Sequence, residues 1–201
     1  MEKINYNKIS NSKNLRLYIL EHNLVIEEMI SRAIGTILNI EWQKSKSFGY
    51  SSSSLSFNQK VTLVQDFKDI KPEEIKKFGY LMNIRNKFAH VREVETWNDF
   101  FEIMGNGKEI KKAFENWYKN SKPPKLNDEE QIMSFYFKSL CDDLIFRLDY
   151  IILKSSLEQL KDKTERHINL IQNIQLLSTL RSMPDGNKII ENLEKKLGQK
   201  F

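Results

Sequence analysis

The residues of this chain best suited to chemistry lie close together, within residues 81–90. An arginine, an asparagine and a histidine occur there as Arg85, Asn86 and His90. Arginine is a permanent cation that neutralises phosphate charge, and histidine exchanges protons near neutral pH. This trio suits proton transfer beside a phosphate group. We expect His90 to act as general acid/base, Arg85 to stabilise charge in the transition state, and Asn86 to hold the imidazole or the phosphate.

RNA is the substrate whose cleavage requires the fewest catalytic groups from such a site. Its own 2′-hydroxyl can attack the adjacent phosphorus, so neither a protein nucleophile nor a metal-activated water is needed. The sequence contains no Gly-rich phosphate loop, no recognisable Ser-His-Asp pattern and no paired Cys/His metal spacing. We therefore expect a metal-independent endoribonuclease that uses no cofactor and spares DNA.

The element that must position these side chains is predicted to be a half-buried helix. Its apolar residues recur at steps of three and four, as on one face of an α-helix: Leu81, Ile84, Phe88 and Val91. On that helix Asn86 and His90 lie one turn apart, whereas Arg85 points about 140° away from His90. The arginine can reach back to the imidazole, or both can meet a second copy of the helix across a two-fold axis.

Residues 85–90, Arg-Asn-Lys-Phe-Ala-His, resemble the signature of the HEPN superfamily, in which an Arg and a following polar residue precede a His by four to six positions. The segment with Phe57, Lys60 and Leu63, and the helix opened by Pro72, resemble the mannitol operon repressor branch. There a Phe-x-x-Lys helix precedes an Arg-Asn-x-Phe-Ala-His helix. The resemblance covers about residues 14–155.

This resemblance implies a helical homodimer whose two motif helices face one another across a composite active site. It also implies metal-independent RNA cleavage in toxin or antiviral defence, with an antitoxin or regulatory protein as a further partner. Toxins paired with a small nucleotidyltransferase usually carry Tyr two residues after the His, where this chain has Arg92, so tyrosine modification is not expected. The mannitol repressor branch implies an alternative: a non-catalytic regulatory or protein-interaction module in which the motif braces a dimer interface.

The composition favours helices over strands. The 201 residues are 40% hydrophobic and 29% charged, with only 7 Gly and 4 Pro, which predicts an all-α chain with enough apolar residues for one core. The net charge of +5 permits RNA binding without requiring it. Cys141 is the single cysteine, which excludes a disulfide framework and suits a reducing compartment. It lies on an apolar stripe and is predicted to be a small core residue. We find neither a signal-peptide pattern nor a membrane-length apolar run, so we expect a cytoplasmic protein that does not contact membranes.

The chain before the motif predicts two further helices and a loop. Residues 14–40 form one long predicted helix, on which Glu27 and Glu28 either orient Arg85 or, more commonly for such residues, form a solvated acidic face. Residues 42–54 are rich in Ser and Lys and predict a mobile loop. Ser56 and Gln59 form a capping box that opens a short helix, whose apolar residues are predicted to face inward: Phe57, Val61, Val64 and Phe67.

The motif helix itself should begin at Pro72 and run to about Val91. Glu73 and Glu74 complement the positive end of its dipole. Gly79 should let a neighbouring helix approach closely.

Beyond the motif we expect an insertion and a closing helix. Residues 96–125 should form two short helices around Gly105 to Gly107, whose aromatic residues either stack on bases or pack in the core, followed by a stiff connector from Ser121. Asn127 and Glu130 form a predicted cap pair that opens the last bundle helix.

The sequence thus predicts an up-and-down bundle, HEPN-like, over residues 1–155, with the insertion at about 96–125. Residues 156–201 should add a helical hairpin that breaks near Pro184 and carries His167 in a structural role near its apolar side.

Overall fold

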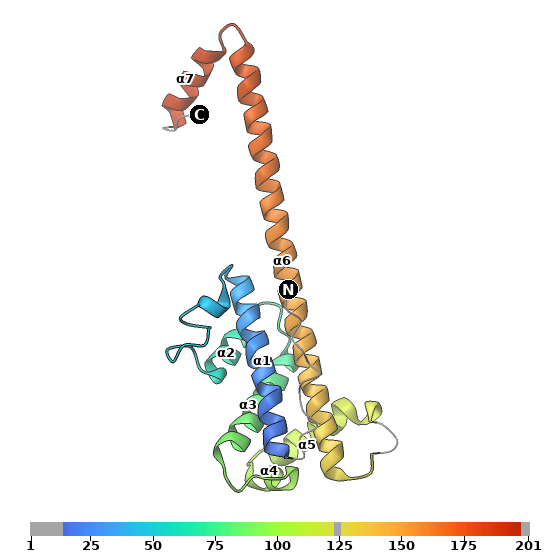
Figure 1. Cartoon of the computed structure of the whole chain (residues 1–201). Coiled ribbons are helices and arrows are strands. Elements are labelled where there is room, and N and C mark those ends of the chain that lie inside the picture. Colours follow the sequence, from blue (N-terminus) through green and yellow to red (C-terminus); the bar gives the residue numbers. More distant parts are fainter. Residues whose placement is uncertain (1–13, 123–125, 198–201) are drawn as a thin grey trace. The chain divides into compact units, whose positions relative to one another are not determined.

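The computed structural model describes residues 14–122 and 126–197 (Figure 1). Every regular element within these residues is helical, so the predicted all-α fold is confirmed. The described residues fall into two compact units, one ending at Leu153 and the other starting at Lys154. We describe α6 (Glu129–Ser182) in two parts, because this single helix contributes to both units.

Helices α1 (Leu15–Ile37), α2 (Phe57–Gln65) and α3 (Pro72–His90) build the bundle together with the first part of α6. Helices α1 and α3 lie side by side in opposite directions (Figure 1). Their apolar stripes are almost fully buried, as the three- and four-residue periodicity predicts: Ile19, Ile26, Ile30 and Ala33 in α1, and Phe78, Leu81, Ile84 and Phe88 in α3. From α6, Phe137, Leu140, Leu144 and Leu148 complete this core, next to buried Cys141. The prediction of a small core residue at Cys141 is confirmed.

Helix α1 ends three residues earlier than predicted. Asn39 has a φ of 54°, and the amides of Asn39 and Ile40 donate to the carbonyls of Thr36 and Gly35. This is the Schellman arrangement that closes a helix with a left-handed residue. Glycine is the usual residue at that position, so an asparagine is a weaker signal for the end of a helix. The apolar residues around Asn39 continued the helical pattern, and the predicted helix was therefore too long.

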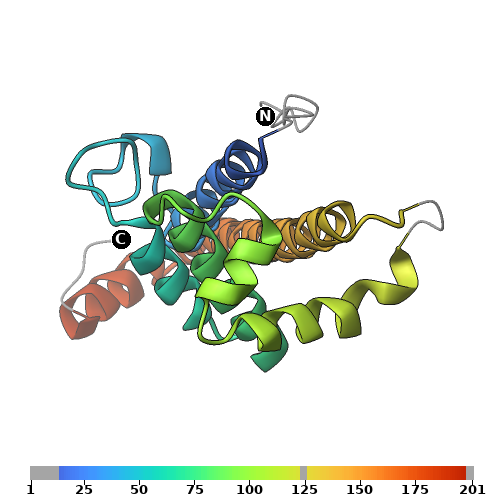
Figure 2. The same ribbon diagram turned by 90° about the horizontal axis from the view of Figure 1, so that it is seen from below.

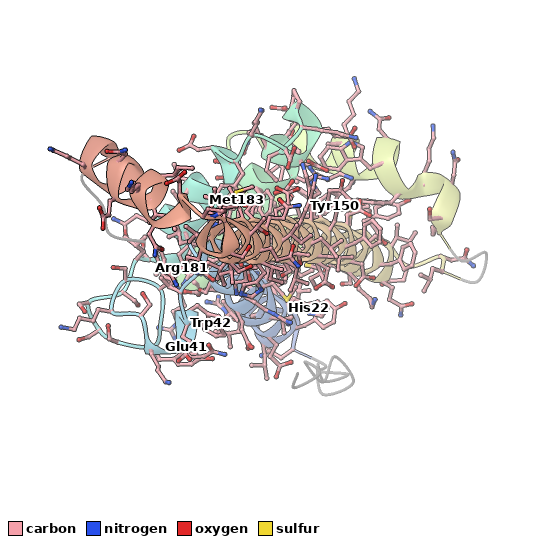
Figure 3. All side chains as sticks on the ribbon, turned by 90° about the horizontal axis from the view of Figure 1, so that it is seen from above. His22, Glu41, Trp42, Tyr150, Arg181 and Met183 are labelled. Carbon is pink, nitrogen blue, oxygen red and sulfur yellow. The ribbon has the colours of Figure 1, made fainter. Side chains whose placement is uncertain are left out.

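The segment after α1 is a loop, as predicted, but Trp42 within it packs against α1. Trp42 opens the short 3-10 turn η2 (Trp42–Lys44) and is 8% exposed. A Cβ added at Gly35 would lie 2.7 Å from Trp42 Cβ, so the glycine lets the indole close on α1. Trp42, labelled in Figure 3, also meets the ring of Tyr50 edge-on.

The predicted starts of α2 and α3 are confirmed. Ser56 and Gln59 form both bonds of the capping box at α2, and Pro72 is the first residue of α3 with Glu73 and Glu74 in its first turn. The prediction for Gly79 is wrong. No atom would lie within 4 Å of a Cβ there, so this glycine faces open space and does not mediate a close helix contact.

Two short helices, α4 (Trp97–Ile103) and α5 (Gly107–Tyr118), confirm the predicted pair in the insertion, and Figure 2 shows them following α3 (green to yellow). Of the two uses foreseen for the aromatic residues, core packing accounts for most of them. Trp97, Phe100, Phe114 and Tyr118 are at most 5% exposed, which removes them from any base-stacking role. The predicted connector lies partly outside the described residues, since 123–125 are not among them; residues Lys119–Ser121 form the 3-10 turn η3.

The start of α6 corrects the predicted cap pair. The carboxylate of Asp128, not the side chain of Asn127, accepts from the amide of Gln131. Glu130 instead reaches across to α4, where its two carboxylate oxygens accept from the amides of Trp97 (2.9 Å) and Asn98 (3.1 Å). The acidic residue assigned to one helix start therefore caps another, where the exposed amides and the helix dipole favour a negative charge.

The second unit contains the rest of α6 and α7 (Gly186–Leu197). The break between them lies at Met183 to Asp185, as predicted. The first helix of the expected hairpin is, however, the continuation of α6. His167 is exposed rather than packed against an apolar surface, which corrects its expected structural role. Among the described helices, not one combines the length and the apolar composition that a membrane span requires.

Candidate active site

Arg85, Asn86 and His90 meet within a single chain. Arg85 Nη1 lies 3.4 Å from His90 Nε2 and donates to Asn86 Oδ1 at 3.2 Å. Of the two routes that the sequence left open for joining Arg85 to His90, the arginine side chain reaching back along its own helix is the one present. The imidazole is exposed, whereas the arginine and the asparagine are half-buried.

The start of α2 supports the arginine and the asparagine. The guanidinium carbon of Arg85 lies 5.7 Å from the centre of the Phe57 ring, within the range of a cation–π contact. Asn86 Nδ2 donates to Asn58 Oδ1 at 3.4 Å. At this position the motif helix therefore faces α2 of the same chain, an element that the resemblance did not lead us to expect here.

Helix α2 is fixed in turn by a buried ion pair with α1. Lys60 Nζ lies 3.0 Å from Glu27 Oε1, and the lysine side chain is only 5% exposed. A buried ammonium without its partner would be strongly unfavourable, so this contact restricts where α2 can pack. It also answers the question of the acidic face: Glu27 pairs with Lys60, and Glu28 lies beside Tyr50, so neither orients Arg85.

Arg16 holds the end of the motif helix. Its guanidinium donates to four backbone carbonyls, those of Phe88 (2.7 Å), Val91 (3.0 Å), Arg92 (2.9 Å) and Val94 (2.9 Å). Carbonyls in the last turn of a helix lack intrahelical partners, and a cation also suits the negative end of the helix dipole. His90 lies between the first two of these anchored residues, so its backbone is held on both sides.

The contact between Arg85 and His90 implies a defined tautomer. Arginine can only donate, so Nε2 of the neutral imidazole is the acceptor and the hydrogen is on Nδ1. A phosphate that binds the guanidinium would draw its donors away and leave the Nε2 lone pair free to take a proton. Lys87, one turn before His90, adds a further positive charge on the same helix.

The site is open and lies on the surface of the bundle. Two hollows of the bundle have other linings: one includes Arg16, Thr96 and Glu130, and the other includes Glu74 and Arg147. An exposed imidazole beside a half-buried guanidinium suits a polymer that lies across the surface better than a small molecule that must be enclosed.

Three supporting residues were missed as parts of the site. Phe57 was predicted to face inward, but its place under Arg85 depends on how α2 crosses α3. Asn58 carries no local signal. Arg16 contacts residues 72 to 78 positions away, so no local sequence pattern could have identified it.

Comparison with models of known protein families, with curated proteins and with solved structures found no match for this chain.

Proposed function

We propose that this chain is a metal-independent endoribonuclease of HEPN type. The observation that supports this most directly is the contact of 3.4 Å between Arg85 Nη1 and His90 Nε2 at an exposed helix end. A fixed cation and a proton carrier at this separation can act on the same phosphodiester. The resemblance of residues 85–90 to the HEPN signature supports the same class and a role in toxin or antiviral defence.

The reaction begins with the 2′-hydroxyl of the RNA. Its oxygen attacks the adjacent phosphorus while His90 Nε2 takes its proton, the bond from phosphorus to the 5′-oxygen breaks, and a 2′,3′-cyclic phosphate remains. The 5′-oxygen leaves with a proton supplied by a second acid. In a homodimer, the His90 imidazole of the second copy can supply it when that imidazole is protonated, which is the role of the composite site expected from the resemblance.

The other side chains act on the phosphate and on one another. Arg85 neutralises the charge that grows on the non-bridging oxygens, and a charge-assisted donor of this kind is worth most when it is already oriented. Asn86 and the Phe57 ring provide that orientation, since both contact the guanidinium. DNA has no 2′-hydroxyl and is not cut by this route.

The test is cleavage of single-stranded RNA by the full-length protein with excess chelator, beside DNA of the same sequence. His90→Ala should lower the rate by about 100-fold or more, the scale of a positioned acid/base group. Glu158→Ala is the control, because Glu158 is also exposed but lies in the second unit. Cleavage that survives the double substitution of Arg85 and His90 by alanine, or that attacks DNA equally, would show that the proposal is wrong.

A second candidate function is the non-catalytic interaction module. The observation that favours it is the large exposed apolar surface of the second unit, where Leu157, Leu160, Ile171 and Ile174 are each more than half exposed. If the chain were only such a module, His90→Ala would leave its biological effect intact in a protein that remains folded. Loss of the effect in a folded variant of unchanged mass argues for the nuclease.

A further inference from the structure

A regular row of exposed side chains runs along the second part of α6. We call it the heptad seam; its six residues recur at alternating steps of three and four: Leu157, Leu160, Thr164, His167, Ile171 and Ile174. The four aliphatic members are between 55% and 59% exposed, and the two polar members are exposed as well. All six belong to the unit that starts at Lys154. Soluble chains rarely leave such a row in water.

The period of the row indicates what covers it. A straight α-helix has 3.6 residues per turn, so a strict seven-residue repeat drifts around its surface unless the helix coils about a partner with the same repeat. The repeat also extends upstream, where Phe146, Tyr150 and Leu153 keep the spacing and are exposed. Residues 146–174 thus cover about four heptads, the length at which such a pattern indicates a coiled coil.

We propose that the heptad seam binds the seam of a second copy of this chain as a parallel, in-register, two-stranded coiled coil. A second copy offers the same repeat in the same phase. Thr164 and His167 interrupt the apolar positions, and in register each lies opposite its own counterpart. A shift by one heptad would place them opposite aliphatic side chains, and a polar residue at such a position is a known determinant of alignment.

The charges beside the seam agree with the parallel direction. In that arrangement Asp149 comes opposite Lys154 of the second copy, Lys161 opposite Ser156 and Lys163 opposite Ile168, so these flanking pairs contain one attraction and no repulsion. An antiparallel pair with full overlap of the seam would place Leu153 opposite Ser178 and Tyr150 opposite Arg181. The upstream apolar positions would then lose their apolar partners.

The first experiment measures the mass of the full-length protein by sedimentation over a range of concentrations. Leu160→Asp should weaken the dimer by about 100-fold or more, because it places two carboxylates opposite one another in an apolar layer. Leu176→Asp is the matched control, since Leu176 has the same exposure of 59% on the same helix but lies outside the seam. A monomeric wild-type protein, or a dimer equally stable in both variants, overturns the proposal.

The second experiment fixes the direction and does not depend on a disruptive change. Under mild oxidation Leu160→Cys should give an interchain disulfide, because equivalent positions meet only in a parallel, in-register pair, whereas Leu176→Cys should not. Cys141 is fully buried, so it does not compete. Equal crosslinking of both variants, or none in Leu160→Cys, overturns the parallel pair. Neither experiment measures RNA cleavage, so failure of the proposed function would leave this result standing.

Discussion

Two histidines in this molecule show how position decides the use of one side chain. His22, labelled in Figure 3, is a core residue that is only 4% exposed. Its ring lies 4.2 Å from that of Tyr18 and 5.8 Å from that of Phe137. Its Nδ1 donates to the carbonyl of Tyr18 at 2.8 Å. His90 lies in the open beside Arg85. Burial makes the first histidine part of the packing, and exposure leaves the second available to a substrate.

The electrostatic surroundings of the core histidine reinforce this division. Burial lowers the pKa of His22 most, Lys138 lowers it further, and the Tyr18 carbonyl, Asp142 and Glu21 oppose the shift. Its neighbours are also kept neutral: burial raises the pKa of Tyr18 to about 12 and that of the Cys141 thiol well above its usual value. Burial therefore disfavours the charged forms of His22, Tyr18 and Cys141, whereas Arg85 and Lys87 place positive charge near His90.

The largest effects should appear when the stability and the RNA cleavage of His22→Ala are compared with those of His90→Ala. His22→Ala should destabilise the fold by about 2 to 4 kcal/mol, since it empties a packed aromatic-sized site. It should leave cleavage per folded molecule unchanged. His90→Ala should do the reverse, with a stability change within about 0.5 kcal/mol. Urea unfolding and RNA cleavage, measured on both variants, would contradict the comparison if each variant lost both properties.

The next effect concerns Arg16, which links the core to the site. Arg16→Ala should cost about 1.5 to 3 kcal/mol, because it removes a charged donor from carbonyls at the end of α3. It should also slow cleavage, since His90 loses its backbone anchor. Arg32→Ala is a control of the same chemical change on α1. Full activity and normal stability in the Arg16→Ala variant would show that this residue does not couple the core to the site.

A smaller effect should appear with pH. The folded state holds His22 with a lowered pKa, while the unfolded chain titrates near the reference value of about 6.5. The stabilising contribution is thus present above about pH 6.5 and declines as pH falls, with a slope of at most about 1.4 kcal/mol per pH unit. Urea midpoints between pH 7.5 and 5.5 measure it. His22→Gln should flatten the profile, and an unchanged slope in that variant would assign the effect to other groups.

The smallest effect should come from Phe57. Phe57→Leu keeps an apolar residue at the start of α2 but removes the ring face under Arg85, a contact worth about 0.5 to 1 kcal/mol at a partly exposed site. We expect cleavage to slow by only about two- to five-fold. Phe114→Leu, a change at a buried ring away from the site, is the control for lost packing. Equal slowing in both variants would show that the ring acts through stability alone.

The sequence predicted the elements that depend on neighbours along the chain. The capping box of Ser56 and Gln59, Pro72 at the start of α3 and the buried stripe through Leu81 and Phe88 are local or periodic features, and all are confirmed. The joining of Arg85 to His90 was one of two open routes. It depended on a side-chain conformation that periodicity cannot specify.

The failures share a different cause. Glu130 caps α4 rather than α6, and Glu27 pairs with Lys60. In both cases the carboxylate binds a group that is distant in the sequence. Gly79 faces open space, which a sequence cannot distinguish from a close helix contact. In each case the residue type was informative about chemistry, but the partner was selected by the tertiary arrangement.

The bonds of Arg16 also bear on the order in which the molecule folds. The arginine and the carbonyls that it binds are 72 to 78 residues apart, so a long loop must close before they can meet. Contacts of such large sequence separation form late and slow the folding of a helical protein. During synthesis on the ribosome, Arg16 in α1 can complete these bonds only after the chain has emerged as far as Val94. The end of α3 that carries Arg85 and His90 therefore becomes fully anchored only after that point, and the proposed site cannot form earlier.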